Sequence, residues 1–313
     1  MKIILKKLLA LIITLFMVSV LAFLAFQIIP GDPTTKMLGT EATSEAVAEL
    51  RAELGLDRPV LVRYAGWLGD FLTGDMGISY SYRTPVREMI GQKLPVTGLL
   101  TLLSFVFTAV LSIPLGTLAG NVKSKALDRV IAVIDQVVMS IPPFFLGILT
   151  CYVCGLILKL FVPGSFVSPE SDFWGCVAYL VFPALAIALP RAAMTVKMLR
   201  SSIQKELLQD YVRTAQSRGN GRWSILFRHV LKNALIPVIT FLAVSMAEIL
   251  TGSIIVEQVF SVPGIGRLLL ASIGNRDFPV VQAIVVILAT WIVVVNYLAD
   301  MLNLLADPRI RRR

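Results

Sequence analysis

Six segments of this sequence are long and apolar enough to cross a lipid bilayer as helices. The hydrocarbon core of a bilayer is about 30 Å thick, so a spanning helix needs roughly 20 mainly apolar residues. Hydrophobic residues make up 56% of the chain and charged residues only 16%, as is typical of integral membrane proteins. We therefore expect an all-α integral membrane protein with about six transmembrane helices. The predicted spans cover residues 8–29, 96–120, 130–158, 173–189, 234–256 and 278–298.

The distribution of positive charge predicts how these spans are oriented. Lysine and arginine accumulate in the cytoplasmic loops of membrane proteins. Of the 29 lysines and arginines, 19 fall in the N-terminus, the loops 121–129 and 190–233, and the C-terminus. We therefore expect both termini to be cytoplasmic. Because topology accounts for the net charge of +9, nucleic acid is not an expected partner.

The predicted spans divide the chain into four parts. Residues 1–29 form a first transmembrane helix, which we expect to be retained because no A-x-A cleavage pattern follows it. Residues 30–95 form a small extracytoplasmic cap, with an amphipathic helix in EAVAELRAELGL that ends at Gly55, followed by an extended stretch and glycine turns. Residues 96–305 form the transmembrane core, which includes a cytoplasmic loop over 191–233. Residues 306–313 form a basic cytoplasmic tail.

Prolines and glycines inside the spans predict helices that are bent and closely packed. Pro142 and Pro143 remove backbone donors in the third span, and the freed carbonyls must then find partners on neighbouring helices or in a cavity. Small residues in the spans allow helices to approach closely, although ordinary packing is the alternative; they include Gly116, Gly120, Gly147, Gly155 and Gly252. This pattern favours a packed, mobile bundle over a simple anchor.

The segment from Tyr211 to Asn233, YVRTAQSRGNGRWSILFRHVLKN, is basic and contains the only histidine, His229. Tyr211 to Arg218 has the pattern of a short helix, and Gly219 is placed for a left-handed C-cap. The apolar residues that follow Trp223 predict a second amphipathic helix. Two helices joined at a glycine would make a compact cytoplasmic docking element, although a solvated basic loop is the alternative.

This segment resembles the cytoplasmic EAA motif of ABC-importer permeases, in the form found in the dipeptide, oligopeptide and nickel subfamily. The match rests on RTAQSRG at 213–219 and on RHVLKNALIP at 228–237. Subfamily signatures recur in order along the chain: GLDRPVLVRYAGWL at 55–68, GDMGISYSYRTPV at 74–86, VEQVFSVPGIGRLL at 256–269, NRDFPVVQ at 275–282 and LADPRIR at 305–311. The resemblance implies that the coupling loop contacts an ATPase through Arg213, Thr214, Ala215, Arg218, Gly219 and Trp223.

The resemblance also implies the partners and the location of the protein. They are a second homologous permease, two ATP-binding subunits and an extracytoplasmic solute-binding protein, in the cytoplasmic (inner) membrane of a bacterium or archaeon. The sequence contains no G-x-x-x-x-G-K-[ST] pattern, so we expect ATP and Mg²⁺ on the partner subunits and no cofactor on this chain. It would thus be a pore-forming subunit and not an enzyme.

The expected substrate is a small peptide, and a nickel ion or metal chelate is the alternative. The chain has one histidine and a lone CxxC, Cys151 to Cys154, so it offers no ligand cluster for a bare metal ion. We expect these cysteines to pack against helices or lipid. A chelated metal would need no such ligands, so the alternative stays open.

Five polar residues in or near the spans are candidates for the translocation path or for contacts between helices. They are Asp135, Glu248, Glu257, Asn296 and Asp300. Charged groups inside a bilayer are costly and by default are functional or paired. An intramembrane protease is a remote alternative, because the aspartates lack the Y-D and G-x-G-D contexts and no G-x-S-x-G or H-E-x-x-H pattern occurs.

Overall fold

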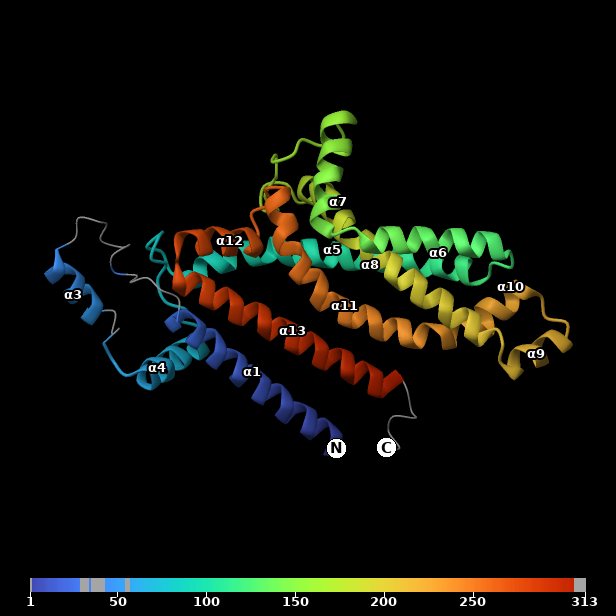
Figure 1. The fold of residues 1–313 in the computed structure, drawn as a ribbon, viewed down its shortest axis with the longest axis horizontal. Helices are drawn as coiled ribbons and strands as arrows, with labels where there is room; N and C mark the ends of the chain where they lie inside the picture. Colours follow the sequence, from blue (N-terminus) through green and yellow to red (C-terminus); the bar gives the residue numbers. More distant parts are fainter. Residues whose placement is uncertain (1, 29–33, 35–42, 54–56, 307–313) are drawn as a thin grey trace. The chain divides into compact units, whose positions relative to one another are not determined.

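The computed structural model describes residues 2–28, 34, 43–53 and 57–306, and the regular elements within these ranges are helical (Figure 1). Five helices are long and apolar enough to cross a membrane, and a bent pair of helices makes a sixth candidate span. This confirms the expected all-α membrane fold. The helices are α1 Lys2–Ile28, α3 Ser44–Glu53, α4 Val60–Thr73, α5 Val86–Gly120, α6 Lys125–Ser140, α7 Pro143–Thr150, η1 Cys151–Ile157, α8 Phe173–Glu206, α9 Asp210–Ser217, α10 Arg222–Ile225, η2 Leu226–Val230, α11 Leu231–Val259, α12 Ile265–Asn275 and α13 Phe278–Ala306.

The chain separates into two compact units. One comprises Met1–Pro95 and Pro263–Val294, and the other comprises Val96–Val262 and Val295–Arg313. The predicted end of the cap helix at Gly55 and residues 307–313 of the predicted basic tail lie outside the described residues. The four-part domain division stays a prediction.

In the first unit, a stripe of aromatic residues holds α4 against α1. The ring of Phe23 on α1 lies 5.4 Å from that of Tyr64 and 5.7 Å from that of Trp67, both on α4. The hydroxyls of Ser19 and Tyr64 are hydrogen-bonded at 2.8 Å. The expected extended stretch after residue 55 is therefore wrong, because Tyr64, Trp67 and Phe71 recur at helical spacing and build one face of a helix.

In the second unit, α8 is the central helix and packs against α6, α7 and α11. It continues to Glu206, well past the predicted end of the span at Leu189. The prediction stopped where basic residues begin, but these residues have polar partners within the unit. Arg200 binds Asp128 of α6 at 2.7 Å, and Lys197 donates to Gln136 of α6 at 3.3 Å.

The third predicted span is broken. Helix α6 and the helical segment 143–157, made of α7 and η1, meet at an angle of 92°. Proline disfavours helical backbone in the residue before it, and Ile141 is extended, with ψ at 121°. Pro142 and Pro143 lack the N–H groups that would continue the helix, so the bend follows from the sequence.

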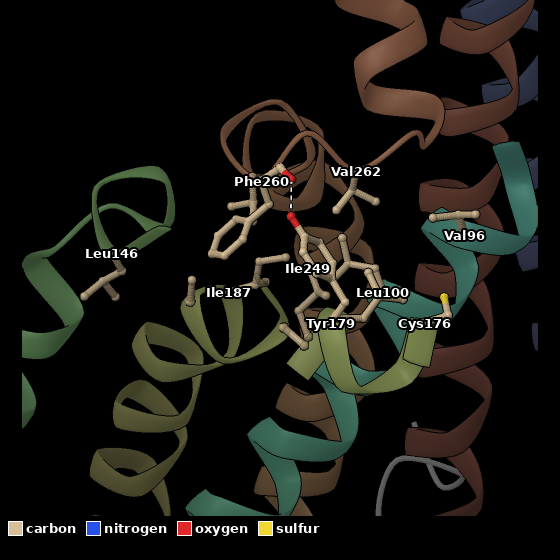
Figure 2. Packing of buried hydrophobic residues seen from close by; sticks show 13 residues of the cluster. Val96, Leu100, Leu146, Cys176, Tyr179, Ile187, Ile249, Phe260 and Val262 are labelled. Atoms are coloured by element: carbon tan, nitrogen blue, oxygen red, sulfur yellow. Dashed lines mark hydrogen bonds between the residues drawn. The ribbon is translucent and has the colours of Figure 1, made fainter. Parts of the chain in front are cut away.

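An apolar cluster joins α5, α7, α8 and α11 at one end of this unit (Figure 2). Within it, the hydroxyl of Tyr179 on α8 donates to the carbonyl oxygen of Phe260, just after α11, at 2.6 Å (Figure 2). The same hydroxyl accepts from the N–H of Gly164 at 2.9 Å. The hydroxyl of Tyr179 and the two backbone groups that it contacts are therefore all hydrogen-bonded inside the apolar cluster. Polar as well as apolar contacts hold the helices together at this end of the unit.

Two glycines allow α5 to lie close to α8. A Cβ atom added at Gly116 would come within 3.0 Å of Leu199, and one at Gly120 within 2.8 Å of Ile203. Real Cβ atoms essentially never approach as closely as the one at Gly120 would, and the contact at Gly116 would also be unusually tight, so the two helices pack closely at these glycines. This agrees with the expectation that small residues in the spans allow helices to approach closely.

Candidate functional site

A compact helix corner connects α8 to α11. We use this name for residues 210–230, which comprise α9, a glycine turn, α10 and the π-helical turn η2 (Figure 1). Gly219 has a φ of +79°, a left-handed conformation that favours glycine and confirms the predicted C-cap. The N–H of Gly219 donates to Gln216 at 2.9 Å, and that of Asn220 donates to Ala215 at 3.3 Å. These bonds form a Schellman motif, which ends α9 and reverses the chain.

The underside of the helix corner is apolar and buried. Val212 and Ala215 of α9 lie in one cluster with Leu199 and Ile203 of α8. Ala215, which the resemblance implies as an ATPase contact, is only 7% exposed, so most of its side chain is covered by this chain itself. The remaining buried members of the cluster are Ile225, Leu226, Val230, Ala234, Val238 and Leu242.

Polar contacts also attach the helix corner to neighbouring segments. The guanidinium of Arg222 donates to the side chain of Asn121 at 2.5 Å and also to its backbone carbonyl. The phenol of Tyr211 donates to Glu206 at 2.5 Å. Partial burial raises the pKa of Tyr211, and the hydrogen bond to Glu206 raises it further. The helix corner is therefore held at Tyr211 by the end of α8 and at Arg222 by the α5–α6 loop.

The opposite surface of the helix corner is exposed and basic. Thr214 and Gly219 are exposed with the two arginines of α9 and its cap, Arg213 and Arg218. Trp223 is 53% exposed and stacks on Phe227, with ring centres 6.0 Å apart and planes at 18°. A face with exposed arginines and aromatic rings has the composition of a protein-binding surface.

The helix corner is continuous with a transmembrane helix. Residues Arg222–Val259, which comprise α10, η2 and α11, form one helix that qualifies as a membrane span. The sequence predicted the amphipathic segment and the span at 234–256 as separate elements. Because the two are one rod, a displacement of the exposed face can be carried directly into the membrane.

Glu248 lies on this same helix and forms an ion pair with Arg191 of α8. The two residues are 57 positions apart, and both belong to helices that qualify as spans. Of the two roles expected for Glu248, in the translocation path or in a contact between helices, the ion pair shows a contact with another helix of the same chain. The carboxylate side chain is still 48% exposed and the arginine 28% exposed, so this chain leaves part of the pair uncovered.

Comparison of the sequence with models of known protein families identifies the family of this chain. Residues 112–312 match the model of the binding-protein-dependent transport system inner membrane component. Residues 1–101 match the model of the N-terminal part of such membrane components. The chain belongs to this permease family.

Two curated relatives of this permease cover almost its whole length. A probable peptide ABC transporter permease, y4tP of Sinorhizobium fredii, is 33% identical over 98% of both chains. The oligopeptide transport permease AppB of Bacillus subtilis is 35% identical over 94% of both chains. A solved inward-facing structure of the MetNI methionine ABC transporter has a TM-score of 0.56 at 17% identity, and the match covers 70% of this chain and 96% of the MetNI chain. That structure supports the fold.

The other membrane candidates of the permease occupy different environments. Glu257 is fully buried in α11 and accepts a hydrogen bond of 2.7 Å from Thr97 of α5, which ties two helices together. Asp135 of α6 is buried, and its Oδ2 atom has no hydrogen-bond partner among the described residues. Asn296 and Asp300 are both exposed on α13. The five candidates therefore do not gather into one site, and their roles stay predictions.

A buried polar cluster that the sequence does not reveal lies in the first unit of the permease. The carboxylate of Asp277 accepts from the hydroxyl of Ser79 at 2.5 Å, and from the backbone N–H groups of Tyr80 at 3.0 Å and Ser81 at 3.3 Å. Burial raises the pKa of Tyr80, Arg63 partly offsets this, and the Asp277 charge raises it further. Ser79 and Asp277 fall within the quoted segments 74–86 and 275–282, but nothing in one sequence reveals that they pair.

The described residues offer no site built like a metal centre. No group of three or more His, Cys, Asp or Glu side chains lies close enough together to hold an ion in this part of the chain. Cys151 and Cys154 are half-buried free thiols, and Cys176 is buried.

Proposed function

We propose that this permease is one of two membrane subunits of an ATP-driven importer, and that its helix corner is where an ATP-binding subunit docks. The continuity of the exposed corner with α11 is the observation that carries the proposal. The corner is anchored underneath by its apolar cluster and exposed on its outer face. A rigid element of this kind can transmit the closure of an ATPase to the membrane helices.

The complete importer needs subunits that this chain does not supply. Two ATP-binding subunits would hold ATP and Mg²⁺ and hydrolyse the nucleotide, which leaves this chain without a catalytic role. A solute-binding protein would deliver the substrate from the other side of the cytoplasmic membrane. A second, homologous permease would form the other half of the translocation path, most simply as a heterodimer. Docking from inside the cell requires a cytoplasmic corner, in agreement with its positive charge.

Small peptides are the proposed substrates. The relatives whose names specify a peptide or oligopeptide substrate match this chain almost from end to end. A bare nickel ion would need soft or imidazole ligands, which do not cluster in the described residues. A metal chelate is the second candidate, because it carries its own ligands.

Reconstituted vesicles test this proposal directly. The permease would be purified with its partner subunits, inserted into lipid vesicles and supplied with the solute-binding protein and a radiolabelled oligopeptide. Uptake should require ATP, both permeases and the ATPase subunits. Uptake that continues without the ATPase subunits would contradict an ATP-driven importer, and uptake of nickel chelates but no peptide would reverse the assignment of the substrate.

A further inference from the structure

A large hollow lies among three helices of the second unit, on the side of α8 that leads toward the helix corner. Its volume is about 660 Å³, within the range of about 300–1,000 Å³ that is typical of small-molecule sites. Helices α6, α8 and α11 contribute its walls. The lining residues that matter here are Met139, Met194, Lys197, Met198, Lys205 and Phe241.

The Arg191–Glu248 pair continues the wall of this hollow. Arg191, Met194, Met198 and Lys205 recur at intervals of three, four and seven residues, so they share one face of α8. Phe241 and Glu248 stand seven residues apart and share a face of α11 in the same way. The ion pair therefore lies beyond the methionines, on the side of the hollow away from the helix corner.

The depth of the ion pair argues that it faces water or a polar ligand. The hydrogen bond between Tyr179 on α8 and Phe260, just after α11, shows that these two residues lie at the same height along the two helices. At 1.5 Å per residue, Arg191 and Glu248 each lie roughly 18 Å along their helices from that level, inside the segments that qualify as membrane spans. Charged groups exposed to lipid at such a depth are strongly unfavourable. Since both side chains are partly exposed, the face that they share is better suited to an aqueous path.

The chemistry of the walls matches a short peptide. Methionine side chains are flexible and polarisable, so Met139, Met194 and Met198 can adapt to apolar side chains of different shapes. Lys197 and Lys205 are exposed in the same hollow and can bind a carboxylate. The single acid of the lining, Glu206, already accepts a hydrogen bond from Tyr211. The hollow therefore favours an anion over a free metal cation.

We propose that this hollow, together with the Arg191–Glu248 pair, is a peptide-binding segment of the translocation path. The methionines and Phe241 contact the apolar side chains of the peptide, and Lys197 and Lys205 bind its C-terminal carboxylate. The proposal rests on the proposed importer function and names the place where this chain meets its substrate. A second permease that packs into the hollow is the competing occupant.

Site-directed labelling distinguishes these occupants. Cys151, Cys154 and Cys176 would first be replaced by alanine, and single cysteines then placed in the hollow by Phe241→Cys or Met198→Cys. Ile239→Cys is the matched control, because Ile239 is 47% exposed on α11 at the same depth but does not line the hollow. The intact transporter complex would be held in lipid nanodiscs and treated with a water-soluble maleimide. Trileucine and trileucine amide serve as the two probes.

We expect the cysteines in the hollow to react about tenfold faster than the control, because a thiol in lipid has a raised pKa and little reactive thiolate. Trileucine should slow the reaction, and trileucine amide should slow it less because it lacks the carboxylate. Labelling as slow as that of Ile239→Cys would mean that the partner permease or lipid covers the hollow, and would overturn the proposal. Fast labelling that neither peptide slows, or that both slow equally, would overturn the peptide site or its carboxylate contact.

ATP-dependent uptake by the same cysteine-free parent separates this proposal from the proposed function. If the parent transports peptide but the hollow fails the labelling test, only the assignment of the hollow is wrong. If the assembled parent and the wild-type complex both lack ATP-dependent uptake, the importer function itself fails. Both measurements use one preparation, so the two outcomes are read independently.

Discussion

At the scale of single residues, the permease pairs two of its membrane carboxylates across helices. Glu248 on α11 bonds to Arg191 on α8, and Glu257 on α11 accepts from Thr97 on α5. Such contacts satisfy groups that would otherwise be costly within a bilayer, and they also set which helix faces meet. Glu248 therefore combines a role in packing with a position beside the hollow.

Removing the charge and hydrogen bonds of Glu248 should impair the permease. Glu248→Leu leaves Arg191 without its carboxylate, whereas Glu248→Gln keeps a hydrogen-bond acceptor. Because the pair is partly exposed, we expect a loss of only about 1 kcal/mol of stability in the leucine variant, with a clear fall in uptake. The glutamine variant should retain much of both. Abundance in membranes and uptake in vesicles are the measurements.

The exchanged pair is the control for this prediction. Arg191→Glu combined with Glu248→Arg should recover part of the abundance lost in Glu248→Leu, because opposite charges again face each other. If Glu248→Leu transports peptide at the wild-type rate, the pair is not needed and the predicted role of Glu248 fails.

The sequence indicated which residues carry charge in the membrane but not which residues pair. Glu248 was recognised as costly because its neighbours in the sequence are apolar. Its partner is 57 positions away, and Asp277 is 198 positions from Ser79. Contacts of this kind depend on how helices pack in three dimensions, and the periodicity of one sequence contains no such information.

At the scale of elements, glycine determines two features that support the site. Gly120 lets α5 meet α8, which in turn supports the underside of the helix corner through Leu199 and Ile203. Gly219 adopts the left-handed turn that reverses the chain after α9. Both were proposed from sequence, because close helix packing and a left-handed C-cap each favour glycine for a known steric reason.

Valine at Gly120 should separate α5 from α8. Its Cβ would lie within 2.8 Å of Ile203, and overpacking of this kind typically costs about 1–3 kcal/mol. Gly98→Val is the matched control on the same helix, because a Cβ there meets nothing within 4 Å. Thermal unfolding of the purified complexes should show a lower Tm for Gly120→Val alone. Equal Tm values in the two variants would contradict the close approach seen here.

Valine at Gly219 should strain the helix corner without any steric clash. A side chain at φ +79° costs about 1–2 kcal/mol, and a Cβ there meets no atom within 4 Å. Gly221→Val is the control, since Gly221 is also in open space but has a φ of −68°. We expect Gly219→Val to reduce ATP-dependent uptake and Gly221→Val to leave it near the wild-type level. Similar uptake in both would show that the turn tolerates the strain.

The elements that differ from the prediction do so for two separate reasons. The predicted span ends at Leu189 because charged residues follow in α8. Mean hydropathy does not take into account that Arg191 and Arg200 form ion pairs with acidic residues of other helices. The segment that forms α4 was predicted to be extended, but Tyr64, Trp67 and Phe71 recur at helical spacing. The break at Pro142, by contrast, follows from local backbone rules and could be anticipated.

At the scale of the whole molecule, the all-helical membrane fold followed from composition and span length alone. Family membership followed from ordered motifs, and the matches over 1–101 and 112–312 agree with it. The partner subunits could not be derived from the physics of one chain, because an exposed basic face is compatible with several partners. Orientation and docking are therefore the whole-molecule claims that experiments should address.

Topology reporters test the orientation. The excess of lysine and arginine in the predicted cytoplasmic segments indicates that the α5–α6 loop, the helix corner and both termini are cytoplasmic. A reporter fused after Arg313 should therefore be active on the cytoplasmic side, and one inserted near Ser44 on the opposite side. Finding both reporters on the same side would exclude a six-span arrangement.

The most direct test of the account is whether the exposed face of the helix corner binds an ATP-binding subunit. Thr214 is exposed between the buried residues Val212 and Ala215, so a bulky side chain there changes the surface without entering the core. Thr214→Trp should be inserted at normal abundance but should recover far less of the ATP-binding subunit in a pull-down, and should lose ATP-dependent uptake. Thr214→Ala, which removes only the 3.1 Å bond to Asp210, should behave as wild type. Full recovery of the ATP-binding subunit and full uptake in Thr214→Trp would contradict the docking role of the helix corner.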